Sequence, residues 1–208
     1  MLIEPEHIAL CMSSSGLAQE PMVTTSDVSK HLDYRRVAPE GLFRRPRLYF
    51  VGEAPGAEES AQGKPFVGPA GRALREMLEE AGIDPKQVRL ANAIPFRPIA
   101  YSKDRKPRNR SPTVEEVACY GAAVLTDIRR SKPGMIIALG STAARLFGES
   151  QSIQAARKAR LQFESCRLRV TFHPAYSRRF GGRKGRIWRQ AVADLRRAWE
   201  DSADSKHA

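Results

Sequence analysis

Four short apolar runs, separated by stretches of helical periodicity, constrain the fold of this chain more than any other feature. Residues Met135–Leu139 are continuously apolar, as in a strand that is buried on both faces of a sheet. We expect strands at residues 48–51, 88–92, 135–139 and 168–172, followed by helices at 72–81, 113–130, 141–148 and 187–199. Strands that alternate with helices join in parallel through right-handed crossovers. The order therefore predicts an α/β fold, a single-domain three-layer α/β/α sandwich around a central, mostly parallel four-stranded sheet.

The two ends of the chain lack this periodicity. We expect three parts: an N-terminal arm at residues 1–46, an α/β domain at 47–199 and a frayed C-terminal tail at 200–208. One short helix is expected near residues 25–34 of the arm. The sequence shows no internal repeat and no second apolar core, so its 208 residues are expected to form one domain of ordinary size.

Charge and cysteine content narrow the class of protein. The chain has 35 lysines and arginines against 23 aspartates and glutamates, a formal net charge of +12. This excess favours a polyanionic partner, either nucleic acid or a membrane surface. No apolar run approaches the roughly 18 residues of a membrane span, and the N-terminus lacks the features of a signal peptide. The cysteines are few and widely spaced, at Cys11, Cys119 and Cys166. Such spacing suggests a reducing compartment, so we expect a cytoplasmic protein without disulfides and without a membrane partner.

Polar residues stand directly after three of the expected strands, at Glu53, Asn92 and His173. The carboxyl ends of parallel strands meet at one edge of a sheet, where open α/β folds bind their ligands. Each residue alone has an ordinary interpretation, as a helix cap, a turn residue or a structural histidine. Because all three share this position but lie far apart in sequence, we predict that their side chains meet in one pocket.

Two basic segments follow these polar residues. Residues 97–110 contain six bases and one acid, and residues 157–197 contain thirteen bases and two acids, a net charge of +11. A solvated surface would also explain such runs, but two basic loops beside one pocket suit a phosphate backbone. The residues that we expect to contact DNA are Arg105, Arg108, Arg110, Ser141, Tyr176, Ser177, Arg178, Arg179, Arg183 and Lys184.

The dipeptide Gly63-Lys64 does not complete a phosphate-binding P-loop. Glu58 stands where that motif needs its first glycine, and Pro65 replaces the hydroxyl residue that follows the lysine. We therefore set a nucleotide-hydrolysing function aside.

The glycine-rich stretch after the first strand resembles the first motif of family 4 in the uracil-DNA glycosylase superfamily. The matching letters are Gly52-Glu53-Ala54-Pro55-Gly56-x-x-Glu59-x-x-x-Gly63-x-Pro65-Phe66-Val67-Gly68. Asn92 matches the asparagine after the second strand, residues 109–119 and 139–144 resemble the segments that follow, and residues 173–176 resemble the second catalytic motif. The resemblance covers about three quarters of the chain, from residue 48 to residue 199, and implies the fold of that superfamily.

The resemblance also implies a role for each matching residue. Phe66 would stack on a flipped-out uracil, and Asn92 would read the polar edge of that base. His173 would donate a hydrogen bond to the pyrimidine oxygen that becomes negative as the base leaves. Glu53 would position or activate the attacking water and favour the cationic sugar, while Glu59 would support the loop. The implied substrate-binding residues are Gly52, Ala54, Glu59, Phe66 and Asn92.

The implied activity is that of a monofunctional uracil-DNA glycosylase. Such an enzyme hydrolyses the N-glycosidic bond of uracil in DNA and leaves an abasic site, which is the first step of base excision repair. We expect a monomer whose partner is uracil-containing DNA, single- or double-stranded. Two alternatives stay open: a glycosylase for other deaminated bases, such as hypoxanthine or xanthine, and a non-catalytic protein that binds abasic sites.

The chain departs from family 4 at the ligands of its iron–sulfur cluster. Members resembling this chain hold the cluster with four cysteines, but here Ser14 stands three positions after Cys11, and Phe96 occupies the third ligand position. Only Cys119 matches, and Cys166 lies far from the motif. We therefore expect no cofactor and no metal, with Phe96 filling the site as a packed side chain.

Further departures concern the loops around the pocket. Ser60 replaces the usual aspartate after Glu59, and Ser177 stands where the resemblance suggests a leucine that wedges into the duplex. We expect Tyr176, Arg178 or Arg179 to fill the gap left by the flipped base. A related branch bonds covalently to DNA through a histidine in a basic insert, but residues 97–110 contain no histidine, so we set that activity aside.

Overall fold

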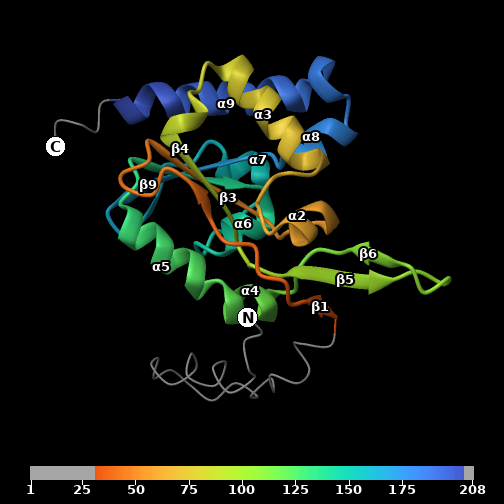
Figure 1. Cartoon of the computed structure of the whole chain (residues 1–208). Coiled ribbons are helices and arrows are strands. Elements are labelled where there is room, and N and C mark those ends of the chain that lie inside the picture. The colour runs from red at the N-terminus through yellow and green to blue at the C-terminus, as the bar shows by residue number, and fades with distance from the viewer. Residues whose placement is uncertain (1–30, 204–208) are drawn as a thin grey trace.

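The computed structural model describes residues 31–203, which build a six-stranded sheet between two layers of helices (Figure 1). The strand order is β2-β4-β3-β7-β9-β8. The four central strands are parallel and correspond to the four predicted runs: β3 (Leu48–Gly52), β4 (Val88–Asn92), β7 (Met135–Leu139) and β9 (Cys166–Thr171). The three-layer α/β sandwich is confirmed.

The sheet is larger than predicted, and it is mixed. Strand β2 (Glu40–Gly41) pairs antiparallel with β4, and β8 (Leu161–Phe163) pairs antiparallel with β9. The prediction of a four-stranded sheet was wrong because both added strands lie at the edges and are only two or three residues long. Neither strand is buried on both faces, so neither has the continuous apolar run that marks the four central strands.

One face of the sheet is covered by the two longest helices, α3 (Pro69–Ala81) and α9 (Arg186–Ala203). Leu74 and Met77 of α3 and Trp188 and Leu195 of α9 belong to one buried cluster with the sheet. Burial of side chains of this size stabilises a fold by about 1.5–3 kcal/mol each. Helix α9 runs beyond the predicted end at residue 199, because Ser202 is buried and its hydroxyl donates to the Trp199 carbonyl.

The other face is covered by α5 (Ala122–Ser131) and α6 (Ser141–Arg145). The single helix predicted at residues 113–130 is divided at Gly121 into α4 (Val114–Tyr120) and α5. A Cβ atom at position 121 would lie 2.4 Å from Cδ1 of Leu146, so the glycine permits a close approach of neighbouring segments. The remaining helices are short: α2 (Ala57–Gln62), η2 (Pro85–Gln87), α7 (Ile153–Ala156), α8 (Pro174–Arg179) and η3 (Gly182–Lys184).

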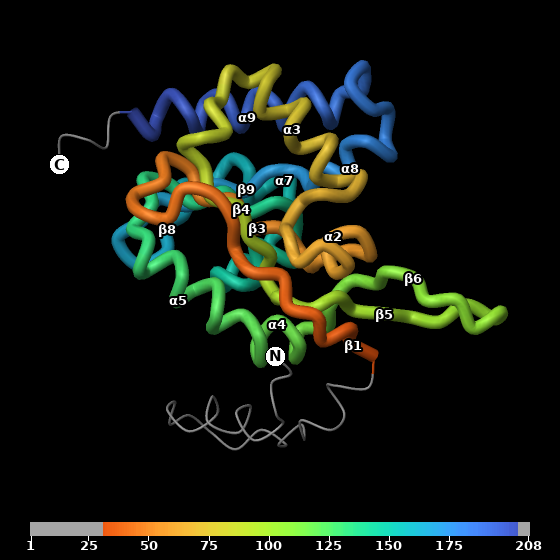
Figure 2. Tube along the Cα trace, in the orientation of Figure 1, coloured from red at the N-terminus to blue at the C-terminus, as the bar shows by residue number. Residues whose placement is uncertain are grey.

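The loop predicted at residues 95–110 is a β-hairpin that projects from the domain (Figure 1). Its strands are β5 (Arg97–Tyr101) and β6 (Pro107–Asn109), and β1 (Leu32–Asp33) pairs with β5 to give a separate three-stranded sheet. Figure 2 shows the chain leaving β1 and crossing the molecule to the start of β3. The helix predicted near residues 25–34 is not present in its described part, residues 31–34, where Leu32–Asp33 form strand β1. Residues 25–30 lie outside the described residues, as do residues 204–208.

Candidate active site

The structure brings the carboxyl ends of the parallel strands to one edge of the sheet. Strands β3 and β4 pair so that Gly52 stands opposite Asn92, and β7 pairs with β9 so that Leu139 stands opposite Thr171. Glu53 follows β3 directly, and His173 is the second residue after β9. Each of these polar residues therefore emerges at the same edge of the sheet as the others.

Gly52 brings the predicted base-binding residues together. A Cβ atom at position 52 would lie 2.6 Å from Oδ1 of Asn92 and 2.6 Å from Cζ of Phe66. Real Cβ atoms do not approach other atoms this closely, so any side chain here would displace the amide or the ring. The glycine thus leaves room for an aromatic ring and an amide side by side at the end of β3. Ala54, half-buried, continues the same turn.

Phe66 has a strained backbone. Its φ angle is +56°, in the left-handed region that costs a non-glycine residue about 1–2 kcal/mol, and only 4% of its surface is exposed. Arg75 Nη1 donates to the Phe66 carbonyl over 2.9 Å. Gly71 lies so close that a Cβ atom there would overlap the same carbonyl. Helix α3 therefore holds Phe66 in a conformation that the free chain would avoid, which fixes the ring against Gly52.

Glu59 ties together the two halves of the glycine-rich stretch. Its carboxylate is buried, with Oε2 accepting from the Gly56 amide over 3.1 Å and Oε1 from the Gly68 amide over 2.8 Å. A carboxylate near the start of α2 also interacts favourably with the helix dipole. These two bonds hold the turn after Glu53 and the turn after Phe66 at a fixed separation.

The next residue, Ser60, connects this loop to the segment before the sheet. Its hydroxyl is buried and donates to Oδ2 of Asp33 over 2.7 Å, while Arg35 forms a bidentate pair with the same carboxylate. Hydrogen bonds from the Arg35 side chain, with Ser60 adding another, hold the pKa of Asp33 well below its ordinary value. A carboxylate therefore does lie next to position 60, and it comes from strand β1.

His173 caps helix α8 with its side chain. The Ala175 amide donates to Nδ1 over 3.2 Å, so in the neutral ring the proton sits on Nε2. Burial lowers the pKa of His173, and the nearby Glu53 carboxylate opposes that effect. Gly140 adopts a φ angle of +87°, and a Cβ atom there would lie 3.1 Å from the His173 Cβ. The arrangement favours a neutral imidazole that donates through Nε2.

Helix α8 also carries an aromatic pair next to the predicted site. Tyr176, 45% exposed, stacks on Phe172 with 6.1 Å between ring centroids, and Phe180 lies 4.4 Å from Tyr176. Phe180 was not among the predicted site residues, although its spacing of four residues from Tyr176 is a helical signal. Arg178, Arg179 and Lys184 are exposed nearby.

Two predicted DNA contacts are placed differently from the rest. Ser177 has no exposed surface, and its hydroxyl donates to the His173 carbonyl over 3.3 Å. Arg110 donates to both carboxylate oxygens of the buried Glu116, over 2.7 and 2.6 Å. Both side chains are therefore committed to internal bonds, and we do not retain them as DNA contacts. Charge and sequence position could not reveal these partners.

The remaining predicted contacts lie at the surface. Arg105 and Arg108 are exposed on the hairpin, and Ser141 is exposed at the start of α6. Arg183 is exposed but forms an ion pair with Glu80 of α3 at 2.8 Å. That pair fastens the basic loop after α8 to the domain.

The residues around Phe96 do not fit an iron–sulfur cluster. The Phe96 ring packs between Tyr34 at 5.4 Å and Tyr120 at 5.3 Å, and Cys119 is half-buried nearby on α4. Within residues 31–203, no group of three or more histidine, cysteine, aspartate or glutamate side chains is arranged to hold a metal ion. Cys11 lies outside the described residues. Among the described residues Cys119 is the one cysteine at a matching ligand position, and one cysteine is not a ligand set for such a cluster.

Comparisons with known proteins give a consistent result. Residues 39–201 match the family model described as the uracil DNA glycosylase superfamily. The type-4 uracil-DNA glycosylase of Thermotoga maritima is 38% identical over 155 residues, which cover 73% of this chain and 76% of that protein. The type-4 uracil-DNA glycosylase of Pyrobaculum aerophilum is 36% identical over 140 residues, 62% of this chain and 66% of that protein.

A solved structure supports the fold assignment alone. The crystal structure of wild-type SMUG2 from Pedobacter heparinus superimposes with a TM-score of 0.54 at 13% identity, covering 77% of both chains. In the described part of this chain, none of the helices has the length and apolar content that a membrane crossing requires.

Proposed function

Because this chain belongs to the uracil-DNA glycosylase superfamily, we propose that Glu53, Asn92 and His173 perform its chemistry at the edge of the sheet. The protein is a DNA repair glycosylase that excises uracil by hydrolysis. The observation that carries the residue assignment is the packing of Asn92 and Phe66 against Gly52, with Glu53 and His173 at the same edge.

Recognition of the base requires an extrahelical uracil. The face of Phe66 would stack on the ring, and the Asn92 amide, with one acceptor and two donors, would pair with the polar edge of the pyrimidine. Gly52 and Ala54 would line the pocket with backbone, and Glu59 would keep the two loops at their separation. Phe66 and the loops that Glu59 joins are already held by internal hydrogen bonds, so they would lose little conformational entropy when the base binds.

Cleavage of the glycosidic bond places negative charge on the uracil and positive charge on the sugar. Nε2–H of a neutral His173 would donate to the pyrimidine oxygen where that charge develops. The Glu53 carboxylate would favour the cationic sugar and orient a water molecule toward C1′. The water oxygen forms the new bond to C1′, the bond from C1′ to N1 of uracil breaks with its electron pair on the base, and the water proton leaves through Glu53.

Contacts to the DNA backbone would come from both sides of the pocket. Arg178 and Arg179 lie in the last turn of α8, Lys184 lies in η3 just after it, and Arg105 and Arg108 lie on the hairpin. Tyr176, which is 45% exposed with Phe180 beside it, would fill the gap left by the flipped nucleotide. We further propose that the protein acts as a monomer in the cytoplasm, on uracil in single- or double-stranded DNA.

The test is to change Asn92→Ala and to measure excision and binding separately. Uracil-containing oligonucleotides are incubated with protein and cleaved with alkali, while affinity for the same DNA is measured at fixed salt. We expect the rate to fall about 100-fold or more while affinity changes only a few-fold, because the amide reads the base and not the backbone.

Gln162→Ala is the matched control, since this amide is exposed on edge strand β8. It should leave both measurements unchanged. Equal losses of rate and affinity in Asn92→Ala would contradict the base-reading role, and no alkali-sensitive product from the unmodified protein would favour a non-catalytic binder.

A further inference from the structure

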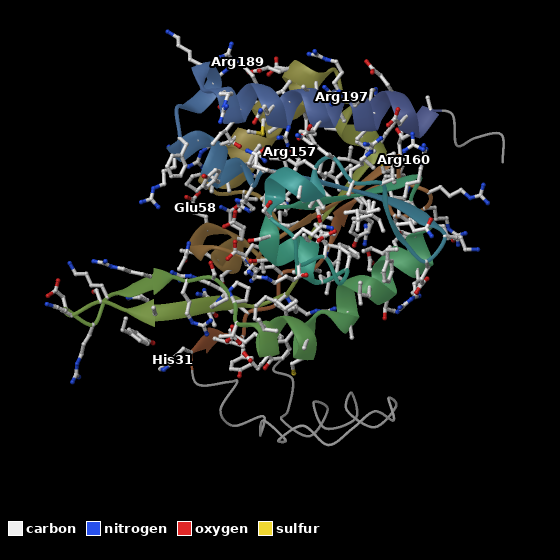
Figure 3. All side chains as sticks on the ribbon, turned by 180° about the vertical axis from the view of Figure 1, so that it is seen from behind. His31, Glu58, Arg157, Arg160, Arg189 and Arg197 are labelled. Carbon is white, nitrogen blue, oxygen red and sulfur yellow. The ribbon has the colours of Figure 1, made fainter. Side chains whose placement is uncertain are left out.

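The β5–β6 hairpin carries a positive charge that the fold does not neutralise. From Tyr101, 59% exposed, to Asn109, every residue except Ser102 is exposed. The hairpin has four bases beyond its root and one acid, Asp104, and within residues 31–203 no ion pair involves any of the four. These bases are Lys103, Arg105, Lys106 and Arg108. Figure 3 shows nitrogen-tipped side chains projecting around the hairpin, with His31 at its base.

The root of the hairpin is fixed to the candidate active site. Strand β5 pairs with β1 so that Arg97 stands opposite Asp33, which also accepts from Ser60 of α2. Arg97 Nε donates to Oδ1 of Asn109 over 2.7 Å. Asn109 also lies close to Gly56, because a Cβ atom at position 56 would be 3.1 Å from Asn109 Nδ2. Gly56 belongs to the turn that Glu59 holds. These contacts therefore fix the orientation of the hairpin relative to the glycine-rich stretch after β3.

The tip of the hairpin has a defined turn. The Ser102 amide donates to the Lys106 carbonyl over 3.0 Å, and the Arg105 amide donates to the Ser102 carbonyl over 2.9 Å. Arg105 adopts a φ angle of +56° within this turn. These bonds hold the chain in a closed turn from which Lys103, Arg105 and Lys106 project.

The hairpin is long on the scale of DNA. The four residue steps of β5 from Arg97 to Tyr101 span roughly 13 Å at about 3.3 Å per strand residue, and the turn at residues 102–106 lies beyond them. Phosphates of one strand are spaced by about 3.4 Å along a duplex, so β5 alone spans roughly four base pairs and the basic turn lies farther out. Figure 1 shows the hairpin projecting from the domain on the side that also carries α2 and α8.

We propose that residues 97–109 form an arm that binds the phosphate backbone of a DNA duplex beside the lesion, so that the enzyme acts best on uracil in long double-stranded DNA. The inference rests on the proposed function, since the arm is placed by reference to the pocket. A rigid duplex holds its distant phosphates at a fixed distance from the flipped nucleotide. A flexible single strand loses conformational entropy to reach the same arm, and a short duplex has no phosphates there.

The test combines an arm variant with substrates of different length. The arm variant carries Lys103→Gln, Arg105→Gln and Lys106→Gln. The matched control carries Lys158→Gln, Arg160→Gln and Arg197→Gln, which removes the same charge from three exposed residues. Arg160 and Arg197 lie away from the hairpin (Figure 3), and Lys158 is two residues before Arg160. Substrates contain one central uracil in a duplex of about 30 base pairs, a duplex of about 10 base pairs, or a long single strand, a range that brackets the reach of the arm.

For the unmodified protein we expect kcat/KM to be about ten-fold higher on the long duplex than on the other substrates. The arm variant should lose that advantage, so that its kcat/KM on the long duplex falls to about its own value on the short duplex and on the single strand. Its salt dependence on the long duplex, as the slope of log K against log salt, should fall by about two to three, and the control should keep the advantage.

Two outcomes would contradict the proposal that the arm binds duplex DNA. In one, the arm variant matches the unmodified protein on the long duplex. In the other, it loses activity equally on all substrates. If instead the unmodified protein excises uracil from none of them, the proposed function fails and the arm with it, which is a distinguishable result.

Discussion

The arginines of the hairpin arm and those of segment 157–197 carry the same charge among different neighbours. In segment 157–197, Arg157 forms a bidentate pair with Asp194, and Arg169 pairs with Asp201. Arg183 pairs with Glu80 of α3. On the arm, Arg105 and Arg108 have no such partner within residues 31–203. Segment 157–197 has the larger excess of positive charge, but carboxylates within the fold neutralise part of that excess.

A basic run in the sequence therefore indicates a DNA-binding surface only where its bases have no acidic partner in the folded structure. Asp194 lies 37 residues beyond Arg157 and reaches it from α9, where it also accepts from the Thr171 hydroxyl over 2.7 Å. The side chains of Arg157 and Asp194 are only 10% and 14% exposed. Arg157 also lies over the Phe172 ring, 4.6 Å from its centroid. This pair therefore supports the strand end that precedes His173.

The largest expected effect comes from breaking the Arg157–Asp194 pair. Arg157→Ala leaves a mostly buried carboxylate without its cation, which should lower the free energy of unfolding by about 3–5 kcal/mol. Denaturant unfolding followed by circular dichroism measures this change. The matched variant Arg178→Ala removes an exposed arginine and should stay within about 0.5 kcal/mol of the unmodified protein.

The same pair of variants separates stability from DNA binding. Arg178→Ala should reduce the salt dependence of DNA affinity, whereas a folded fraction of Arg157→Ala should keep it. Similar unfolding energies for the two variants would show that the Arg157 pair is not structural.

A second comparison is available inside residues 97–110. Arg110→Ala should lower the free energy of unfolding by about 2–3 kcal/mol, because Glu116 is 2% exposed and would lose a bidentate partner. Arg108→Ala, two residues away and exposed, should leave unfolding almost unchanged but weaken binding to duplex DNA. Thermal unfolding and a DNA titration on each variant decide the matter. The comparison fails if Arg110→Ala weakens DNA binding at unchanged stability.

The smallest expected effect concerns a carboxylate. Arg35 and Ser60 hold the pKa of Asp33 below its ordinary value, so its contribution to stability is present above about pH 4 and is lost as pH falls. Asp33→Asn should lower stability by about 1 kcal/mol at neutral pH. Below pH 4 the gap between the two proteins should narrow, as measured by melting temperature across pH 2.5 to 7. A constant gap across that range would assign the effect to packing alone.

Much of the fold followed from the sequence because buried strands need apolar residues. Residues 135–139 are apolar throughout and form the buried central strand β7. Strands β2 and β6 are exposed at every residue, so no hydrophobic pattern marks them. The hairpin was hidden for the same reason, since its ladder is made of backbone bonds between charged and proline-rich segments.

The candidate site was predictable to the extent that chain topology determines it. Glu53 and His173 follow parallel strands and Asn92 ends one, and parallel strands have their carboxyl ends at the same edge. The sequence could not predict the hydrogen-bond partners of individual side chains. Ser177 was expected at the DNA interface because the resemblance places a wedge residue there, but its side chain is buried and its hydroxyl donates to the carbonyl of His173, which caps α8. Arg75, which holds Phe66, had no signal apart from being a base on a helix.

The bond from Ser60 to Asp33 bears on how this protein can be shortened or recombined. The superfamily match begins at residue 39, yet the carboxylate that Ser60 binds lies upstream of it, on the strand that also completes the hairpin sheet. A chain trimmed to the matched region would retain every matched motif residue and lose this support. Residues 32–33, the hairpin and α2 are thus joined by direct contacts, and a graft of the arm onto another glycosylase must carry all three.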